Sequence, residues 1–481
     1  MASFKTDESF LEKIAIGAIG TRQVFRVLRE LGHTPIELER GSMNYKIWKK
    51  IKIKRIRVPD ILCIDNGVRI ESRAKTKLEI SMSHSAADPE RGWDYGMKDN
   101  DYVALVVCSR TGDEPIDWTA DNLVQFVSVR DMREAQREGL ILQELPKGAQ
   151  EGFESRLIWP CSIASAEGIV TQIAPTVKYR TEIRTNFVKL AKKDIELSPQ
   201  LGVGSRVVPN QILASVVNIS QAIPTNHVSS EYYIRNLRSL NLSERYAAAK
   251  ALSFFNEQPV IDALLAKIAD NDEHIYIKLE SAASLCRLGV NEGYVFIERC
   301  LHDEYLQNVL ESVIILAEIK TLQACEILSN VLLDDTYDPE IRAGAAWGLG
   351  EQCNVATLNA LVTSFNFIDE NIRVEAARAL AKLTQNHSIE VVNKFATANA
   401  NEKPGISWAL TKSQTLTLEQ LIPNLTDLNS RQWISYILGM QGEERFIKEI
   451  ERLRETDREV YFATTLLWKI LTSWVHDLKE Y

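Results

Sequence analysis

The sequence predicts a chain of three parts: an α/β domain, a small β-rich domain and an all-α solenoid. Three observations predict this order. A long amphipathic helix pattern and short apolar strands occupy the first 110 residues, short β patterns with Gly, Pro and Asn turns fill residues 160–220, and one helical pattern recurs from residue 241 onwards. A chain of 481 residues has room for two or three domains. We place the domains at residues 1–112, 113–235 and 236–481.

The composition indicates a protein of a reducing compartment. The chain is 45% hydrophobic and 25% charged, which is ordinary for a globular protein. It has no apolar run near the roughly 18 residues of a membrane helix, and the segment M-A-S-F-K-T-D-E-S-F lacks the apolar core of a signal peptide. Seven scattered cysteines without a C-x-x-C spacing favour buried free thiols, and seven dispersed histidines argue against a structural zinc site. We therefore expect a cytoplasmic protein that does not contact a membrane.

The net charge of −9 is distributed unevenly along the chain. Residues 1–240 hold 34 Lys and Arg against 30 Asp and Glu, a net charge of +4. Residues 241–481 hold 22 against 35, a net charge of −13. An acidic surface repels a phosphate backbone, so we expect nucleic acid to bind only the first half. For the acidic half we expect a protein partner or self-association.

The first 110 residues are predicted to contain a helix and several strands, as in an α/β domain. Residues 8–31 show an amphipathic helix pattern that ends at Gly32. Residues 36–39 and 101–109 are predicted strands, the second apolar enough to be buried. Between these strands lie a basic segment, an acidic hairpin, and a turn with a short helix over residues 88–98. This order places a helix before a mixed set of strands.

The middle of the chain carries mainly strand patterns. Residues 124–129 read as a strand and residues 130–139 as a short helix. Residues 160–220 read as several short strands separated by Gly, Pro and Asn turns. We interpret this region as a small β-rich domain that links the two larger ones.

A short hairpin, V-P-D-I-L-C-I-D-N-G-V-R-I-E-S-R-A-K, carries an acid on each of its strands. The Asn66-Gly67 pair is typical of a two-residue type I′ turn, because both residues tolerate positive φ angles. That turn would set Asp60 opposite Arg73 and Leu62 opposite Glu71. Since side chains alternate along a strand, the two acids would share one face of the hairpin.

The two acids of this hairpin predict a metal site. Diagonal neighbours on one face have Cβ atoms about 7–8 Å apart or less, which lets the carboxylates of Asp60 and Glu71 hold one divalent cation. Hard oxygen ligands suit Mg²⁺ or Mn²⁺. Arg73 and Lys75 follow on the same face and would bring positive charge beside the metal.

The order of helix, strand, acidic hairpin, helix and strand resembles the core of restriction-endonuclease-like nucleases, the PD-(D/E)xK superfamily. The resemblance places the two acids at Pro59-Asp60 and in the segment I-E-S-R-A-K that contains Glu71. It implies that Asp60 and Glu71 bind Mg²⁺, which activates water and neutralises charge on the phosphate. It also implies that a lysine orients or deprotonates the water.

The sequence departs from that superfamily where the lysine belongs, because Arg73 stands two residues after the second acid. Arginine keeps its proton, so it can stabilise charge but cannot act as a base. Lys75 lies two residues further on the same face and is the alternative cation. Three interpretations stay open: an active nuclease using Lys75 or Arg73, a nuclease fold that binds nucleic acid without cutting it, and an unrelated hairpin with an incidental charge pair.

A strongly basic segment precedes the hairpin. Seven of the thirteen residues from Tyr45 to Arg57 are basic and none is acidic. The Lys/Ile alternation over residues 50–54 predicts a strand with one cationic face, and Lys54-Arg55 suggests a bulge. The segment is either an edge strand protected by lysines or a strand that contacts phosphates. In the second interpretation the contacts come from Lys46, Lys49, Lys50, Lys52, Lys54, Arg55 and Arg57.

An internal repeat defines the second half. A basic residue is followed by small residues three and four positions later and by Leu seven positions later, which places the small residues and Leu on one helix face. The clear copies are Arg245/Ala248/Ala249/Leu252, Lys278/Ser281/Ala282/Leu285, Arg342/Ala345/Ala346/Leu349 and Arg373/Ala376/Ala377/Leu380, with a degenerate copy at Val309/Ser312/Val313/Leu316. The copies start 31 or 33 residues apart. This pattern resembles short HEAT-like repeats, which stack helix pairs into a solenoid.

Together these features predict a Mg²⁺-dependent DNA endonuclease whose solenoid binds a protein that gates or targets cleavage. By analogy of fold alone, such a plan suits bacterial defence or restriction systems. The alternative is a non-catalytic scaffold, in which a degenerate nuclease domain binds nucleic acid and the solenoid recruits proteins. A third hypothesis gives the function to the solenoid, which would bind a protein substrate as short HEAT-like repeats associated with lyases do.

Overall fold

The computed structural model contains two compact units. It describes residues 7–41, 50, 51, 53, 55–85, 87–145, 154–173, 176–188, 196–198, 201–441, 451, 452, 454, 455 and 458. The first unit comprises residues 1–47 and 55–267, and the second comprises residues 48–54 and 268–481. Within the described ranges, no helix is both long and apolar enough to span a membrane.

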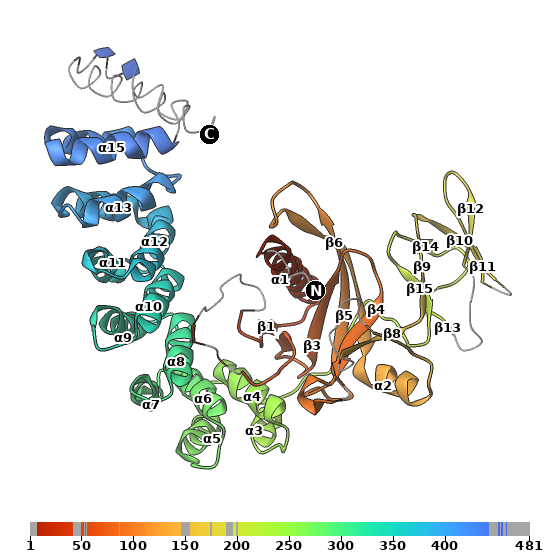
Figure 1. Ribbon diagram of the computed structural model, residues 1–481. Helices are drawn as coiled ribbons and strands as arrows, with labels where there is room; N and C mark the ends of the chain where they lie inside the picture. The colour runs from red at the N-terminus through yellow and green to blue at the C-terminus, as the bar shows by residue number, and fades with distance from the viewer. Residues whose placement is uncertain are drawn as a thin grey trace. The chain divides into compact units, whose positions relative to one another are not determined.

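A five-stranded mixed sheet forms the centre of the first unit (Figure 1). The strand order is β1-β2-β3-β5-β6, and only β3 and β5 run parallel to each other. The bounds are β1 (Pro35–Glu37), β2 (Ile61–Cys63), β3 (Arg69–Lys75), β5 (Tyr102–Arg110) and β6 (Trp118–Ser128). Strands β1 and β5 confirm the strands predicted over residues 36–39 and 101–109.

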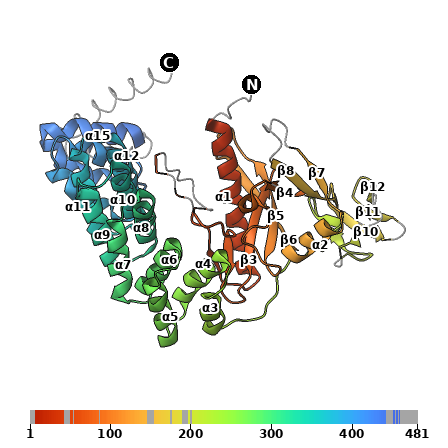
Figure 2. The ribbon, with the colours of Figure 1, turned by 60° about the horizontal axis from the view of Figure 1, so that its bottom comes forward.

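Helix α1 (Asp7–Glu30) covers one face of this sheet (Figure 2). Its apolar residues pack with Ile61, Ile70, Val106 and Phe126. Gly20 lets the helix approach β3, since a Cβ at this position would lie 2.4 Å from the Cβ of Ala74. The chain leaves the helix through Gly32 with a φ of +88°, which confirms the predicted helix and its end.

The opposite face of the sheet packs on a smaller sheet and on helix α2 (Val129–Arg137). The smaller sheet has the order β4-β8-β7, and its strands are β4 (Ile80–Ser85), β8 (Glu154–Trp159) and β7 (Leu142–Glu144). Its core contains Trp93 and Trp159, whose rings meet edge to face with centroids 5.2 Å apart. The helix predicted within residues 88–98 is only the three-residue η1 (Pro89–Arg91), because Gly92 and Gly96 follow and Gly96 has a φ of +77°.

A boundary after residue 112 would divide the central sheet. Strand β6 pairs with β5 from Ser128 to Trp118, and α2, β7 and β8 complete the second layer. Residues 113–145 and 154–159 therefore belong structurally with the N-terminal elements. The sequence could not reveal this, because the pairing of β6 is set by tertiary contacts rather than by a local pattern.

The predicted short strands of the middle region form two further small sheets (Figure 1). The sheets have the orders β12-β11-β10-β14 and β13-β15-β9, and they share a core of Val170, Val177, Tyr179, Val207 and Leu213. Their bounds are β9 (Cys161–Ile163), β10 (Gly168–Gln172), β11 (Val177–Arg180), β12 (Thr185–Val188), β13 (Glu196–Leu197), β14 (Arg206–Val207) and β15 (Ile212–Ser215).

The first unit ends in a series of helices, and the first two of them contact the hairpin. The helices are α3 (Ser230–Asn236), α4 (Leu242–Ala251), η2 (Leu252–Phe254) and α5 (Gln258–Ala269). The Tyr233 hydroxyl donates to the Ile64 carbonyl over 2.8 Å. The Arg69 guanidinium donates to Ser243 Oγ over 2.8 Å. These contacts join helices near residue 240 to a hairpin near residue 65.

The second unit is an all-α solenoid of stacked helix pairs, as predicted (Figure 1). The small residues of the repeat are buried where helices meet: Ala282, Ala345, Ala346 and Ala376 are fully enclosed. Helix α12 contains a kink at His387 and so provides both helices of one pair. The bounds are α6 (Ile275–Arg287), α7 (Asn291–Leu301), α8 (Leu306–Glu318), α9 (Leu322–Leu333), α10 (Pro339–Gln352), η3 (Val355–Thr357), α11 (Leu358–Thr363), η4 (Ser364–Asn366), α12 (Glu370–Thr397), α13 (Glu402–Thr411), α14 (Leu418–Leu421), η5 (Ile422–Thr426) and α15 (Leu428–Gln441).

The basic residue that opens the repeat copies holds the chain that precedes its helix. Lys278 donates to the Asp270 carbonyl over 2.7 Å, and Arg342 donates to the Leu332 carbonyl over 3.0 Å. Arg373 donates to the carbonyls of Phe367 and Ile368 over 2.7 and 2.8 Å. A cation suits these positions because the last carbonyls of a helix lack partners in the helix itself. The repeated basic residue therefore serves the solenoid fold.

Candidate metal and phosphate site

The hairpin connection is longer than the sequence predicts. Cys63 N–H donates to the Val68 carbonyl and Gly67 N–H donates to the Cys63 carbonyl, both over 2.9 Å, so four residues form the loop. Gly67 has a φ of +74°, whereas Asn66 has no positive φ. The type I′ prediction is therefore wrong. The Asn66 side chain instead accepts from Val68 N–H and donates to the Pro224 carbonyl over 2.6 Å.

The longer loop shifts the strand register by two residues. Strand β2 pairs with β3 at Ile61↔Ile70 and Leu62↔Arg69. The predicted pairings of Asp60 with Arg73 and Leu62 with Glu71 are therefore wrong. A shift of two residues preserves the alternation of faces, so the two acids still share a face. Continuing the observed pairing by one residue sets Asp60 opposite Glu71.

Asp60 is buried just before β2 and is tied to the strand of the second acid. The residue is 9% exposed, and its Oδ2 accepts from Ser72 N–H over 2.7 Å. Burial raises the pKa of Asp60 well above its usual range, and the nearby Glu71 and Glu39 carboxylates raise the pKa further. The Ser72 hydrogen bond and Arg73 act in the opposite direction.

Glu39 is a third acid of this cluster that the sequence did not single out. Strand β1 pairs antiparallel with β2, and both Leu38 N–H and Glu39 N–H donate to the Asp60 carbonyl. Part of Glu39 reaches the surface, but its carboxyl shares a hydrogen bond with Asp60. Burial of that carboxyl and the charge of Glu71 raise the pKa of Glu39. The pairing of β1 with β2 reveals this residue, and no local motif does.

The two candidate cations follow Glu71 on the same side of β3. Arg73 Nη2 forms an ion pair with Glu71 Oε1 at 2.7 Å. Lys75 Nζ donates to Ser81 Oγ on β4 over 3.0 Å. Burial and the positive charge of Arg73 lower the pKa of Lys75, although Glu79 opposes this effect. Arg73 therefore directly neutralises an acid, while Lys75 is held beside it by the second sheet.

The predicted basic strand is only partly described. Lys46, Lys49, Lys52 and Lys54 lie outside the described residues. Lys50, Ile51 and Ile53 form no strand, so the strand prediction is wrong for them.

The described basic residues of this segment make structural contacts. Backbone N–H groups of Lys50 and Ile51 donate to the Glu340 carboxylate, which places both residues in the helical unit. Arg57 donates to the carbonyls of Glu90 and Gly92 over 3.0 and 2.9 Å. Arg55 Nη1 donates to the Arg40 carbonyl over 2.5 Å. Phosphate binding by these residues stays a prediction.

A hard divalent cation at Asp60 and Glu71 stays a prediction, in which the two carboxylates would form the protein's part of the site. Within the described ranges, no three His, Cys, Asp or Glu side chains form a group that could hold a metal ion. Mg²⁺ commonly takes one or two carboxylates and fills its remaining positions with waters and substrate oxygens. Ser72 orients Asp60, and Arg73 Nη2 lies 2.7 Å from Glu71 Oε1.

Comparisons with known proteins concern the helical half. No protein-family model matches the sequence, and no curated protein matches it. The complex of CpcE and CpcF of phycocyanin lyase from Nostoc is 20% identical over 52% of this chain and 97% of that chain, with a TM-score of 0.26. Human deoxyhypusine hydroxylase is 15% identical over 46% and 86%, with a TM-score of 0.20. An engineered protein is 18% identical over 50% and 78%, with a TM-score of 0.24.

Proposed function

We propose that the first unit is a Mg²⁺- or Mn²⁺-dependent endonuclease that hydrolyses phosphodiester bonds in DNA, of the PD-(D/E)xK kind. One observation carries the proposal: the hairpin register sets Asp60 opposite Glu71, and burial of Asp60, together with the nearby Glu71 and Glu39 carboxylates, raises the pKa of Asp60. A buried carboxylate beside a second carboxylate favours a cation, because a buried charge is costly without a partner of opposite sign. A cation of this kind assists phosphodiester hydrolysis, because it neutralises charge on the phosphate and lowers the pKa of water.

In this proposal Asp60 and Glu71 hold the metal, which lowers the pKa of water and neutralises charge on the phosphate. Ser72 keeps the Asp60 carboxylate aimed at the site through its 2.7 Å hydrogen bond. Arg73 keeps its proton and stabilises negative charge on the phosphate. Lys75 has a lowered pKa and therefore yields its proton more readily than an ordinary lysine, which suits a group that exchanges a proton with water.

The test is cleavage of DNA by the full-length protein. Supercoiled and linear DNA are incubated with Mg²⁺, Mn²⁺ or EDTA, and an RNA substrate is included. We expect DNA cleavage that EDTA abolishes and that Glu71→Gln and Asp60→Asn each reduce by at least about a hundredfold, as removal of a transition-state stabiliser does. Glu167→Gln is the matched control, since Glu167 pairs with Arg206 in the β-rich region. Metal-independent cleavage, or cleavage that survives both site variants, contradicts the proposal.

One observation favours a second candidate, the non-catalytic scaffold. The 2.7 Å ion pair between Arg73 and Glu71 already supplies a protein cation to the second acid. A degenerate site would keep this pair in place of the metal. Retained DNA binding that EDTA does not affect, without cleavage under any condition, would favour the scaffold. In both candidates the acidic solenoid is proposed to bind a protein partner.

A further inference from the structure

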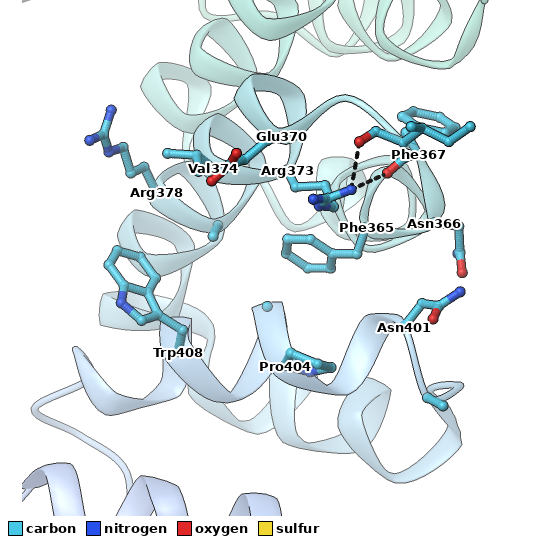
Figure 3. A pocket seen from close by; sticks show the side chains of 14 residues that line it. Phe365, Asn366, Phe367, Glu370, Arg373, Val374, Arg378, Asn401, Pro404 and Trp408 are labelled. Carbon is cyan, nitrogen blue, oxygen red and sulfur yellow. Dashed lines mark hydrogen bonds between the residues drawn. The ribbon is translucent and has the colours of Figure 1, made fainter.

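A groove of about 850 Å³ lies on the solenoid between the first half of α12 and α13 (Figure 3). The end of η4 and the loop after it close one side. The groove belongs entirely to the second unit and is separate from the carboxylates of the first. Apart from Arg373 and Ala377, its lining residues lie outside the repeated positions, so the repeat pattern does not predict it.

The groove has an apolar floor and wall. The Phe365 ring forms the floor and is 4% exposed. Gly405 permits this packing, since a Cβ there would lie 2.4 Å from Phe365 Cε1. Trp408 stands on α13 across from Val374 on α12 (Figure 3). The floor is therefore tightly packed, and the side chains of Trp408 and Val374 line the wall.

An apolar side chain at the mouth of the groove is unusually exposed. Ile368 contributes to the lining and is 96% exposed. Its main-chain carbonyl accepts from Arg373, so the loop that presents it is held in place. A large apolar residue held in water beside an apolar groove is typical of a binding surface.

The charges around the groove differ from those of the surrounding half. Arg378 on the rim is 61% exposed, and its guanidinium forms an ion pair with Glu375 at 2.9 Å. Lys412 Nζ lies 5.3 Å from the Trp408 ring centroid. Glu370 is the acid among the lining residues. Arg378 and Lys412 therefore bring positive charge to the groove beside Trp408, whereas Glu402 accepts a hydrogen bond from the lining residue Asn366. The half of the chain that contains the groove has 22 basic and 35 acidic residues, a net charge of −13.

We propose that this groove binds an extended segment of a partner protein that carries a large apolar side chain beside an acidic one. The apolar side chain packs on Phe365, Trp408 and Ile368. The acidic side chain pairs with Arg378 and Lys412, since both cations are exposed beside Trp408. Acidic surface elsewhere on the solenoid repels such a segment and so favours this location. The inference is independent of the proposed nuclease.

Four peptides of equal length test the two requirements separately. Their centres are Leu-Asp, Leu-Lys, Ser-Asp and Ser-Lys, and binding to the full-length protein is measured by fluorescence anisotropy. We expect the Leu-Asp peptide to bind at least about tenfold more tightly than each of the others, a difference of about 1.4 kcal/mol. Binding of the Leu-Asp peptide should weaken at least about fivefold in Ile368→Ser and in Trp408→Ala.

Matched variants separate the groove from the rest of the solenoid. Ile389→Ser is the control for Ile368→Ser, because Ile389 is also exposed on α12 but does not line the groove. Arg378→Glu should shift the preference from the Leu-Asp to the Leu-Lys peptide, whereas Arg299→Glu on α7 should not. Circular dichroism verifies that each variant keeps its helices. Equal binding of all four peptides, or equal loss in Ile368→Ser and Ile389→Ser, overturns the proposal. Trp408-dependent binding of a single-stranded oligonucleotide without peptide binding would assign the groove to nucleic acid instead.

Discussion

Ser72 donates its backbone N–H to Asp60 Oδ2 over 2.7 Å, so the strand that carries the second acid also orients the first. This bond crosses the hairpin just where β2 begins. The donor is a backbone N–H group, so substitution of side chains on neighbouring strands can leave the orientation of Asp60 unchanged. The backbone of the hairpin therefore sets the position of Asp60 relative to Glu71.

The raised pKa of Asp60 predicts how stability depends on pH. Because the folded-state pKa lies above the ordinary value of 3.8, the folded protein binds this proton more tightly than the unfolded chain does. The resulting stabilisation is present below that ordinary value and is lost as the pH rises through the raised folded-state pKa. In metal-free buffer, Asp60→Asn should therefore melt above wild type at about pH 7 and approach it towards about pH 4.

Melting curves of both proteins across that pH range check this prediction. Added Mg²⁺ should stabilise wild type at neutral pH and narrow the difference, because bound ligand stabilises the folded state. Melting temperatures of the two proteins that differ by the same amount at every pH would contradict the assigned burial and crowding of Asp60.

The hairpin loop requires glycine at position 67 for two separate reasons. Its φ is +74°, and a Cβ there would lie 2.7 Å from Tyr232 Cε1. Gly139 has a similar φ of +72°, but a Cβ added to it would meet no atom within 4 Å, so its substitution reports backbone strain alone. We expect Gly139→Ala to cost about 1 kcal/mol and Gly67→Ala about 2–4 kcal/mol in chemical denaturation. Equal losses would show that the Tyr232 contact is unimportant.

Single and double substitutions of the buried Arg69–Asp101 ion pair should differ in their effect on the free energy of unfolding. Arg69 donates twice to Asp101, over 3.1 and 2.5 Å, and Asp101 is fully buried. Arg69→Met leaves that carboxylate without its guanidinium, which should destabilise the protein by about 3–5 kcal/mol. The double variant Arg69→Met/Asp101→Asn should recover part of the loss in the same denaturation measurement. A double variant as unstable as the sum of two separate losses would contradict the pairing.

Local sequence patterns predicted the structural elements that depend on nearby residues. The periodicity of residues 8–31 and Gly32 define α1 because helix bonds and a positive φ depend on nearby residues. The small residues of the repeat predict the solenoid because each helix pair packs only on its neighbours. Both predictions needed no knowledge of distant contacts.

The hairpin register could not be predicted, since its determinants are remote. Asn66 does not adopt the type I′ conformation, and its side chain donates a hydrogen bond to the carbonyl of Pro224, 158 residues later. Glu39 joins the site through the pairing of β1 with β2 across the basic segment. The shared face of Asp60 and Glu71 was nevertheless predictable, because a shift of two residues preserves the strand alternation.

Titration with Mn²⁺ tests most directly the central claim that Asp60 and Glu71 hold a divalent cation. Full-length protein freed of metal is titrated at neutral pH, with and without DNA, and free Mn²⁺ is followed by electron paramagnetic resonance. The account predicts one Mn²⁺ site that Mg²⁺ competes for, that Asp60→Asn and Glu71→Gln each abolish, and that Glu167→Gln keeps. Equal Mn²⁺ binding by wild type and both site variants, or no binding by folded wild type even with DNA present, would contradict it.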